Sequence, residues 1–291
     1  MRLIKSSFEI LEQEPGLDGI YKQIEKAGRT CYRSQDKITE DSAKKFVDML
    51  INRGHTAVLE HGTIYLKAKV LLSLDVNGDE VKEGKLLKYL TNPYSRIVLD
   101  NGIAYVTTNY RVLYENDWLE DIDYLCEPTE HHVKRIAVRV NCSIGISREW
   151  NRHRKFSICE QSTRYCNYSK DKFNNELTFV IPSWIETIEP GNYNKDHKFP
   201  PMWGHDYWME SIWFYNMCEA EEAYMDMVRE YLIPQQSREV LPLSTATEVI
   251  YTGFVDDWRH FFKLRCDNAA HPDMRALTVP LKGEFINRNY I

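Results

Sequence analysis

Basic side chains gather in one short stretch of the sequence. Residues 148–165 read REWNRHRKFSICEQSTRY, and residues 148–164 carry a net charge of +3. The charged residues of this arginine segment are five cations, Arg148, Arg152, Arg154, Lys155 and Arg164, and two acids, Glu149 and Glu160. Because the whole chain has a net charge of -6, the local excess of positive charge is a candidate site for an anion.

The composition of the arginine segment favours phosphate binding. Arginine outnumbers lysine, and its planar fork can donate two hydrogen bonds to one phosphate. Neutral hydrogen-bonding side chains stand between the cations: Ser157, Gln161, Ser162 and Tyr165. Two further arginines stand apart, Arg238 before Leu241-Pro242 and Arg265 at the end of an expected helix. A solvated basic helix face is the alternative that the segment alone leaves open.

Several common nucleotide-binding and catalytic patterns are absent from the sequence. It contains no G-x-G-x-x-G and no G-x-x-x-x-G-K-[ST], so neither a Rossmann nor a P-loop cradle is indicated. No G-x-S-x-G occurs, which argues against an α/β-hydrolase. His131-His132 could ligate a metal, but on an expected loop this pair is better explained as solvated, and we expect no metal site.

Two side chains of the arginine segment are candidate nucleophiles. The chain has seven cysteines and no C-x-x-C, so reduced thiols in a cytoplasmic protein are the simplest interpretation. Neighbouring arginines could lower the pKa of Cys159, yet a small buried filler is the simpler role for it. Ser162 has no apparent adjacent base, and we expect it to bind a ligand by hydrogen bonding instead.

The order of residues within the arginine segment resembles a known family. Arg152-His153-Arg154, followed by seven residues and Ser162, is similar to the R-H-R-x7-S signature of the flavin-dependent thymidylate synthases. Three further stretches resemble other family segments in the same order: HTAVLEH (55–61), REVLP (238–242) and FFKLRCDNAAHPDMR (261–275). The four blocks cover most of the chain outside 64–147.

This resemblance implies a reaction and a substrate site. The family makes dTMP from dUMP, with methylenetetrahydrofolate as carbon donor and a hydride from FAD that NADPH has reduced. The implied dUMP-binding residues are Glu149, Arg152, Gln161, Ser162, Arg164, Arg238 and Arg265. Arg265 is the implied catalytic residue, because a cation against the uracil ring favours the N3-deprotonated form and a more nucleophilic C5.

The resemblance also implies a flavin site and an assembly. The implied FAD-binding residues are His55, Arg152, His153, Arg154, Glu160 and His260. Members of the family are homotetramers whose active sites are shared between subunits, and we expect the same here. We expect no nucleic acid partner, because the chain is acidic. We expect no membrane partner, because no apolar run approaches the roughly 18 residues of a spanning helix.

The chain departs from the family pattern at several positions. Cys159 stands where the signature usually has Asn, and His260 stands where the family usually has an Asn that touches flavin. Ala57 replaces a Ser or Thr, and Phe254 replaces a polar flavin contact. These changes leave open a related flavoprotein that oxidises NADPH without methyl transfer. A non-catalytic nucleotide-binding or RNA-binding protein is a second alternative, which the net negative charge disfavours.

Elements of both kinds must position these blocks. Hydrophobic spacing predicts helices over 18–29, 39–54, 109–127, 206–233 and 256–265, one that leads into 147–154, and one that begins near 271. Alternation predicts strands over 63–70, 134–140, 177–182 and 248–254, and a hairpin over 96–108. Their irregular order favours an α+β fold, with a mixed or antiparallel sheet covered by helices, as in the thymidylate synthase complementing proteins.

The length and composition fit one domain with an insertion. With 291 residues, 43% hydrophobic and 27% charged, a single globular domain over 1–291 is expected. Residues 71–132 hold none of the four blocks, and we expect them to be a family-specific insertion of a hairpin and a helix. Turn signals occur in it at Asn77-Gly78 and Asn101-Gly102. We expect this insertion to be peripheral and outside the flavin site.

The protein is expected to be cytoplasmic, in its own cell or, if phage-encoded, in the host.

Overall fold

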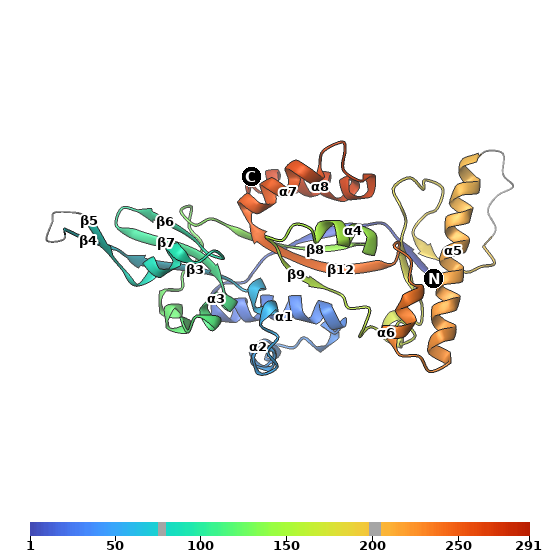
Figure 1. Ribbon diagram of the computed structural model, residues 1–291, viewed down its shortest axis with the longest axis horizontal. Coiled ribbons are helices and arrows are strands. Elements are labelled where there is room, and N and C mark those ends of the chain that lie inside the picture. The colour runs from blue at the N-terminus through green and yellow to red at the C-terminus, as the bar shows by residue number, and fades with distance from the viewer. Residues whose placement is uncertain (75–79, 198–204) are drawn as a thin grey trace.

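A four-stranded antiparallel sheet occupies the middle of the molecule (Figure 1). The computed structural model describes residues 1–74, 80–197 and 205–291. The strand order of the central sheet is β2 (Ser7–Leu11), β8 (Arg135–Ser143), β12 (Ala246–Phe254) and β9 (Ser157–Glu160). Helices lie on both faces of this sheet, so the chain has the α+β architecture that its irregular element order predicts.

The remaining elements surround this sheet. The α-helices are α1 (Gly16–Tyr32), α2 (Ser42–Asn52), α3 (Tyr110–Glu115), α4 (Ile144–Trp150), α5 (His205–Arg229), α6 (Pro234–Ser237), α7 (Val255–Arg265) and α8 (Pro272–Asn287). The 3-10 helices are η1 (Gln35–Lys37), η2 (Thr56–His61), η3 (Lys85–Thr91), η4 (Leu119–Tyr124), η5 (Asp171–Phe173) and η6 (Arg238–Val240). The other strands are β3 (Thr63–Lys69), β7 (Ile103–Asn109) and β6 (Arg96–Asp100) in one sheet, β10 (Thr178–Val180), β1 (Arg2–Ile4) and β11 (Gly191–Asn192) in another, and the pair β4 (Leu71–Leu74) and β5 (Glu80–Glu83).

The two faces of the central sheet pack against different helices. Successive side chains of a strand point to opposite faces. On β8, Val138 and Val140 are buried in a cluster with residues of α4, α7 and α8, whereas Ala137 packs with Ile250 and Ala27 of α1. Figure 1 shows α7 and α8 above the sheet and α1 below it. No helix in the described ranges is both long and apolar enough to cross a membrane.

The turn chemistry of the sequence predicts one hairpin correctly. β6 and β7 pair in register around Asn101 and Gly102, which both have positive φ, 49° and 72°. Such φ values suit a two-residue turn whose twist matches the strands, and Asn-Gly adopts it readily. The strand predicted over 63–70 is also present as β3, which pairs with β7. The other turn signal, Asn77-Gly78, lies outside the described residues.

The single helix predicted over 109–127 is wrong. The chain forms α3, then a break, and then the 3-10 helix η4. The Asn109 side chain caps α3 by accepting a hydrogen bond from the Val112 amide, and the helix ends where Asp117 takes a φ of 58°. A left-handed residue cannot continue a right-handed helix, so the apolar spacing across 109–127 serves two short elements rather than one.

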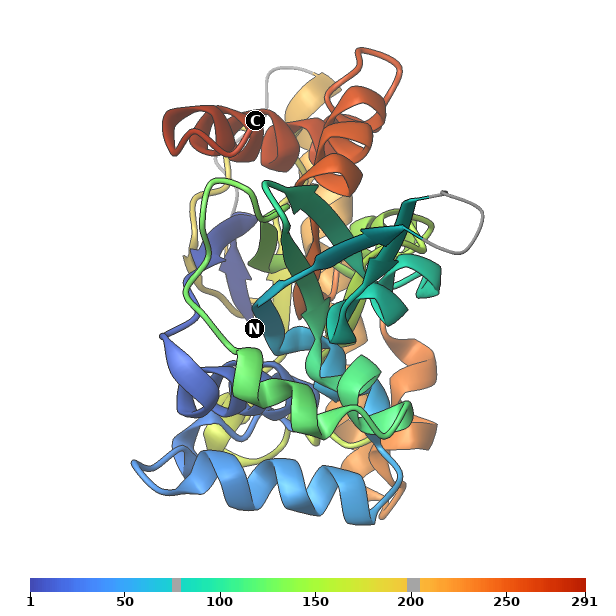
Figure 2. The same cartoon turned by 90° about the vertical axis from the view of Figure 1, so that its left-hand side faces the viewer.

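The expected peripheral position of residues 71–132 needs correction. Strand β7 of this segment pairs along the whole of β3. Leu86, Tyr89, Val106 and Leu113 are buried in one apolar cluster with side chains of α1, α2 and β3. Figure 2 views the molecule from the end that carries the β3–β7–β6 sheet, with α2 at the bottom and the C-terminal helices at the top. The segment therefore completes a core that it shares with the first two helices.

Candidate active site

Helix α4 and strand β9 position the arginine segment. The Ser143 side chain caps α4 by accepting a hydrogen bond from the Ile146 amide. At its other end Trp150 is fully buried, with its ring stacked on Tyr251 at 4.6 Å and on Phe261 at 4.4 Å between centroids. The chain then turns and enters β9, which pairs with β12. The turn that carries Arg152, His153 and Arg154 is thus anchored on both sides.

Three side chains hold the Glu160 carboxylate in place. Ser147 Oγ donates to Glu160 Oε1 at 2.7 Å, and Thr247 Oγ1 donates to the same oxygen at 3.2 Å. Asn151 Nδ2 donates to Glu160 Oε2 at 3.1 Å, and the Asn151 carbonyl oxygen accepts from the Tyr251 hydroxyl at 2.9 Å. Each of these three side chains donates to Glu160, so both carboxylate oxygens are held in place as acceptors.

A cavity of about 630 Å³ opens beside Glu160, and we call it the arginine cavity. Its walls come from α4, from the residues that follow β9, and from η6 and the residues after it. Five residues predicted for the site line it: Glu160, Gln161, Ser162, Arg164 and Arg238. Arg148, one of the five cations of the candidate anion site, lines it as well, although the family resemblance implied no role for it. The sequence could have pointed to Arg148, because it lies one helical turn before Arg152 and so on the same face of the expected helix.

Three arginines and two carboxylates, Glu160 and Glu239, line the arginine cavity. Within the ranges that the structure describes, no carboxylate pairs with Arg148, Arg152, Arg154 or Arg164, and Arg238 meets only the exposed Glu239, at 3.6 Å. Arg164 lies over the Tyr165 ring at 5.4 Å. Arginines left without a carboxylate partner are suited to bidentate binding of phosphate.

Arg265 lies in a second group, at the C-terminal end of α7. Its Nη1 donates to Glu149 Oε2 at 3.2 Å, its Nη2 donates to the Glu149 carbonyl at 2.8 Å, and its Nε donates to His153 Nε2 at 2.8 Å. Thr278 of α8 donates its hydroxyl to the Arg265 carbonyl at 2.9 Å. The guanidinium is therefore held rigidly, with a fifth of the side chain exposed.

His153 stays neutral in this arrangement. Its Nε2 accepts from Arg265, so its proton lies on Nδ1. Burial, then the charge of Arg265, lowers the pKa of His153 to about 4. Near pH 7 the imidazole is therefore neutral, and its Nε2 serves as an acceptor.

The remaining predicted residues lie outside these two groups. Arg152 and Arg154 are exposed in the turn between α4 and β9. The exposed His260 has its ring 6.5 Å from that of His153. His55 is exposed before η2, and no hydrogen bond or ion pair joins its side chain to another predicted site residue in the described part of the chain. The arginine cavity of one copy of the chain is therefore lined by only some of the predicted residues.

Segment 71–132 reaches two positions near the predicted flavin site. The Arg96 guanidinium lies over the Phe254 ring at 4.4 Å, so Phe254 is buried beneath a side chain of this segment. Arg111 Nη1 donates to Glu60 at 2.6 Å, which ties α3 to η2 next to His55. These contacts place parts of segment 71–132 beside two positions that the family resemblance links to the flavin.

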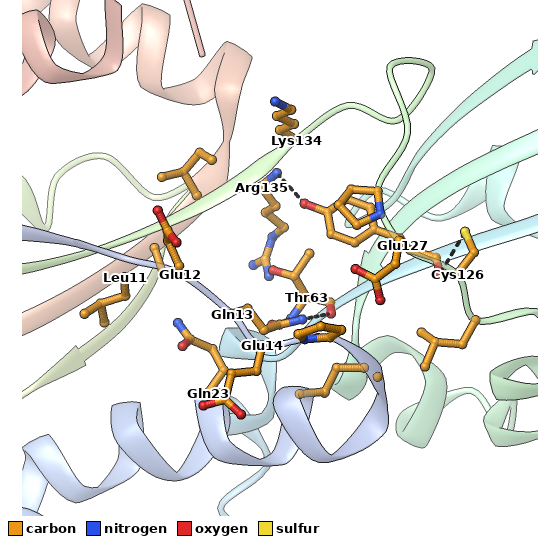
Figure 3. A pocket seen from close by; sticks show the side chains of 18 of the residues that line it. Leu11, Glu12, Gln13, Glu14, Gln23, Thr63, Cys126, Glu127, Lys134 and Arg135 are labelled. Atoms are coloured by element: carbon orange, nitrogen blue, oxygen red, sulfur yellow. Dashed lines mark hydrogen bonds between the residues drawn. The ribbon is translucent and has the colours of Figure 1, made fainter. Parts of the chain in front are cut away.

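A second cavity, of about 280 Å³, opens where α1 begins (Figure 3). Gln13 and Thr63 exchange hydrogen bonds across it, and the Arg135 amide donates to the Tyr65 hydroxyl. None of the predicted site residues lines this cavity. The expectation that His132 is solvated is wrong, because its side chain is buried. Its Nε2 faces the Leu66 carbonyl and its Nδ1 accepts from the Thr129 amide, so both ring nitrogens have protein partners.

His61, which ends segment 55–61, is buried as a neutral imidazole. Its Nδ1 lies 2.8 Å from Thr252 Oγ1, and its Nε2 has no hydrogen-bond partner among the described residues. Burial, and after it the charge of Arg135, lowers the pKa of His61 to about 3. The unfolded chain keeps the ordinary value of 6.5, so below that pH the unfolded state binds a proton that the folded state does not.

This burial predicts loss of stability in acid. The contribution of His61 is fully present above pH 6.5 and falls by about 1.4 kcal/mol per pH unit below it, which gives a loss of roughly 2 kcal/mol by pH 5. Urea unfolding at pH 7.5, 6 and 5 measures the change. A His61→Gln variant, which cannot titrate, should show a shallower pH dependence; equal dependence in both proteins would contradict the prediction.

The side chains present fit a flavin nucleotide in their chemistry. Arg152 and Arg154 are exposed and unpaired in the described chain, as ligands of a pyrophosphate would be, and His153 and His260 lie beside them. Two positions that depart from the family pattern offer no polar contact to a flavin. Phe254 is buried under Arg96, and Ala57 has no polar side chain.

Comparisons with known proteins relate the chain to one family. The family model described as thymidylate synthase complementing protein matches residues 17–73 and 123–287. A flavin-dependent thymidylate synthase of Pyrococcus furiosus is 27% identical over 214 residues, which are 71% of this chain and 80% of that protein. One from Pyrococcus abyssi is 25% identical over 147 residues, 50% of this chain and 52% of that protein. A solved structure, the UMP/dUMP methylase PolB from Streptomyces cacaoi bound with 5-Br UMP, aligns over 99% of this chain and 92% of its own, with 13% identity and a TM-score of 0.46. The family match extends over most of the sequence, and the chain is therefore an enzyme of the thymidylate synthase complementing protein family.

Proposed function

We propose that the protein is a flavin-dependent thymidylate synthase, which converts dUMP to dTMP by reductive methylation. Methylenetetrahydrofolate is the proposed carbon donor, and NADPH the proposed reductant of a bound FAD. The observation that carries the proposal is the arginine cavity, in which Arg148, Arg164 and Arg238 stand beside Gln161 and Ser162. A nucleoside monophosphate offers a dianion to such arginines and amide and carbonyl groups to the neutral side chains.

The arginine cavity is the proposed phosphate end of the dUMP site. Arg148 and Arg164, with no carboxylate partner in the described chain, can each give two N–H donors to the phosphate. Ser162 and Gln161 add a hydroxyl and an amide. Glu160 lies in the same wall as a fixed carboxylate, which accepts hydrogen bonds and repels a phosphate, so it orients the ligand rather than binding its charge.

Arg265 is the proposed catalytic residue. A guanidinium held against the uracil ring favours negative charge on N3 and so a more nucleophilic C5. His153 and Glu149 serve as positioning residues, because they fix two edges of the guanidinium. Since His153 stays neutral, it does not compete with Arg265 for the developing negative charge.

The proposed FAD-binding residues are those of the exposed turn and its neighbours. Arg152 and Arg154 would meet the pyrophosphate, with His55, His153, Glu160 and His260 as further polar contacts. When bound, reduced FAD supplies the hydride of the reaction. The residues of this chain bind and orient the reactants and place a positive charge at the uracil ring.

The division of the predicted residues into two groups supports a shared site. We propose a homotetramer, in the cytoplasm, in which the arginine cavity of one copy is completed by Arg265 and by flavin contacts of others. To test the shared site, Arg238→Ala and Arg265→Ala proteins are unfolded, mixed and refolded together. Some sites in the mixed tetramers then combine an intact Arg238 from one chain with an intact Arg265 from another. Recovery toward a quarter of the wild-type activity is expected; no recovery would place each site within one chain.

The function itself is tested with the purified protein. Visible absorbance of bound flavin and dTMP formed from dUMP, methylenetetrahydrofolate and NADPH are the expected results. Flavin with NADPH oxidation but no dTMP would favour a relative that has lost methyl transfer. A colourless protein that binds RNA with steep salt dependence would reject the proposal.

Replacing Arg164 with lysine should weaken dUMP binding by about 1–3 kcal/mol, because a bidentate contact becomes a single one at constant charge. Calorimetric titration with dUMP measures the change. Arg229→Lys is the matched control, since Arg229 pairs with Asp226 on the surface of α5 and lines no part of the arginine cavity. Unchanged affinity in Arg164→Lys would remove Arg164 from the site.

A further inference from the structure

Two thiols from distant parts of the chain meet at strand β9 of the arginine segment. Cys31 near the end of α1 and Cys159 in β9 have their sulfur atoms 3.4 Å apart. All seven cysteines lie in the described ranges, and no other two of them are joined by a sulfur contact there. Cys159 is the residue that stands where the family signature usually has Asn, so this thiol pair exists because of that departure.

The Cys31–Cys159 pair is held in place by its surroundings. Cys159 is buried against Leu11, Ala137 and Ile250, and Cys31 is half-buried at the rim of this cluster. The end of α1 is fixed to β12, because Thr30 Oγ1 donates to Glu248 at 3.1 Å. The Cys31 carbonyl also accepts a hydrogen bond from the Ser162 amide at 3.0 Å. Little movement is therefore needed to bring the two sulfur atoms to bonding distance.

The two thiols differ in their readiness to react. The hydrogen bond from the Cys159 S–H lowers the pKa of Cys31, although burial and the charge of Glu160 act in the opposite direction. The same hydrogen bond, together with burial, raises the pKa of Cys159 well above its ordinary value. The thiolate is the nucleophilic form, and Cys31 is also the more exposed of the two. Cys31 is thus the first to react and Cys159 the second.

We propose that the Cys31–Cys159 pair is a reversible oxidation site that forms a disulfide with a small hydroperoxide. The Cys31 thiolate attacks one oxygen of hydrogen peroxide, the O–O bond breaks, and hydroxide leaves, so that Cys31 becomes a sulfenic acid. Cys159 then attacks the Cys31 sulfur, the S–S bond forms, and its proton and the sulfenic hydroxyl leave as water. Two thiols are oxidised, one peroxide is reduced to two waters, and a dithiol reductant restores the pair.

The disulfide would join α1 covalently to the strand that leads into the arginine cavity. Cys159 directly precedes Glu160, and the Cys31 carbonyl holds the Ser162 amide. Oxidation therefore fixes the wall that carries Glu160, Gln161 and Ser162 to the end of α1. This inference stands on the thiol geometry and does not require that the protein make dTMP.

The experiment uses hydrogen peroxide on the purified full chain. Thiol titration under denaturing conditions should fall from seven to five per chain and return to seven with dithiothreitol. Peptide mapping without reduction should show residues 31 and 159 in one linked pair. Seven thiols after peroxide treatment, or a linked pair between other cysteines, would overturn the proposal.

Two variants establish the order of the steps. In Cys159→Ser the Cys31 sulfenic acid has no second thiol to attack it, so dimedone should label Cys31 in this variant and not in the wild type. Cys31→Ser should keep its six remaining thiols under the same treatment, and it tests the pair even if Cys159→Ser fails to fold. Cys126→Ser is the control, because the Cys126 thiol contacts the Tyr65 carbonyl and not the pair, and this variant should still lose two thiols. Dimedone labelling of Cys31 at the same level in the wild type and in Cys159→Ser would show that Cys159 does not act on it.

Discussion

Replacing Arg265 with alanine is expected to lower the rate of dTMP formation by about 10²–10³-fold, with FAD still bound and NADPH still oxidised. The guanidinium is the charge proposed to stabilise negative charge on the uracil ring. It is held by Glu149 and His153 rather than by any residue of the arginine cavity. Its loss should therefore remove a contact made at the reacting ring while leaving phosphate binding intact. Turnover with dUMP and flavin reduction by NADPH, measured separately, distinguish the two effects.

Arg259→Ala is the matched control for this prediction. Arg259 lies on the same helix, is exposed, and pairs with Asp256 three residues away. It should alter neither rate. Equal loss of flavin reduction and methylation in Arg265→Ala would show that Arg265 supports the fold around Glu149 and His153, because a structural defect would not spare one half of the reaction.

Replacing residues 75–127 with a short Gly/Ser linker is expected to abolish folding. The replacement removes β7, the pairing partner of β3, and it removes Leu86, Tyr89, Val106 and Leu113 from the core shared with α1 and α2. Truncation of one large buried side chain costs about 2–5 kcal/mol, and whole domains are stable by only about 5–15 kcal/mol. Circular dichroism and gel filtration of the variant should show loss of structure or aggregation.

A shorter replacement separates the shared core from the β4–β5 strand pair. Replacing 72–82 with a two-residue turn leaves β7 and the four core residues above in place. This variant should fold and keep most of the wild-type stability. If the 75–127 replacement instead folds with normal stability, the shared core contributes little and the segment is peripheral after all.

The sequence correctly predicted the elements whose conformation depends on residues close together in the chain. The Asn101-Gly102 turn is correct because the needed φ values are a property of those two residues. Helix α7 is correct because Trp258, Phe261 and Phe262 form an apolar stripe at helical spacing, and this also places Arg265 at its end. The break after Glu115 could not be predicted from spacing, because both short elements bury apolar residues in the same cluster.

Contacts between distant residues could not be predicted in the same way. The pairing of Arg265 with Glu149 joins residues 116 positions apart, and only the packing of α7 beside α4 brings them together. The cover that Arg96 forms over Phe254 likewise depends on where β6 lies beside β12. Family resemblance assigned roles to Arg164 and Arg265, and those roles stay predictions. The structure adds that Arg164 lines the arginine cavity, whereas Arg265 is hydrogen-bonded to Glu149 and His153 outside that cavity.

The core shared by α1, α2 and residues 86–113 also bears on the history of the chain. The family model matches the sequence on both sides of 74–122 but not within it. An ancestor without this segment would need other side chains to cover Leu59 and Ile64, which are now fully buried in that core. If α1, α2 and β3 came to pack their apolar side chains against this segment, each small shortening of it would expose some of that apolar surface to water. Selection for a folded chain would then retain the segment even if it brought no catalytic advantage.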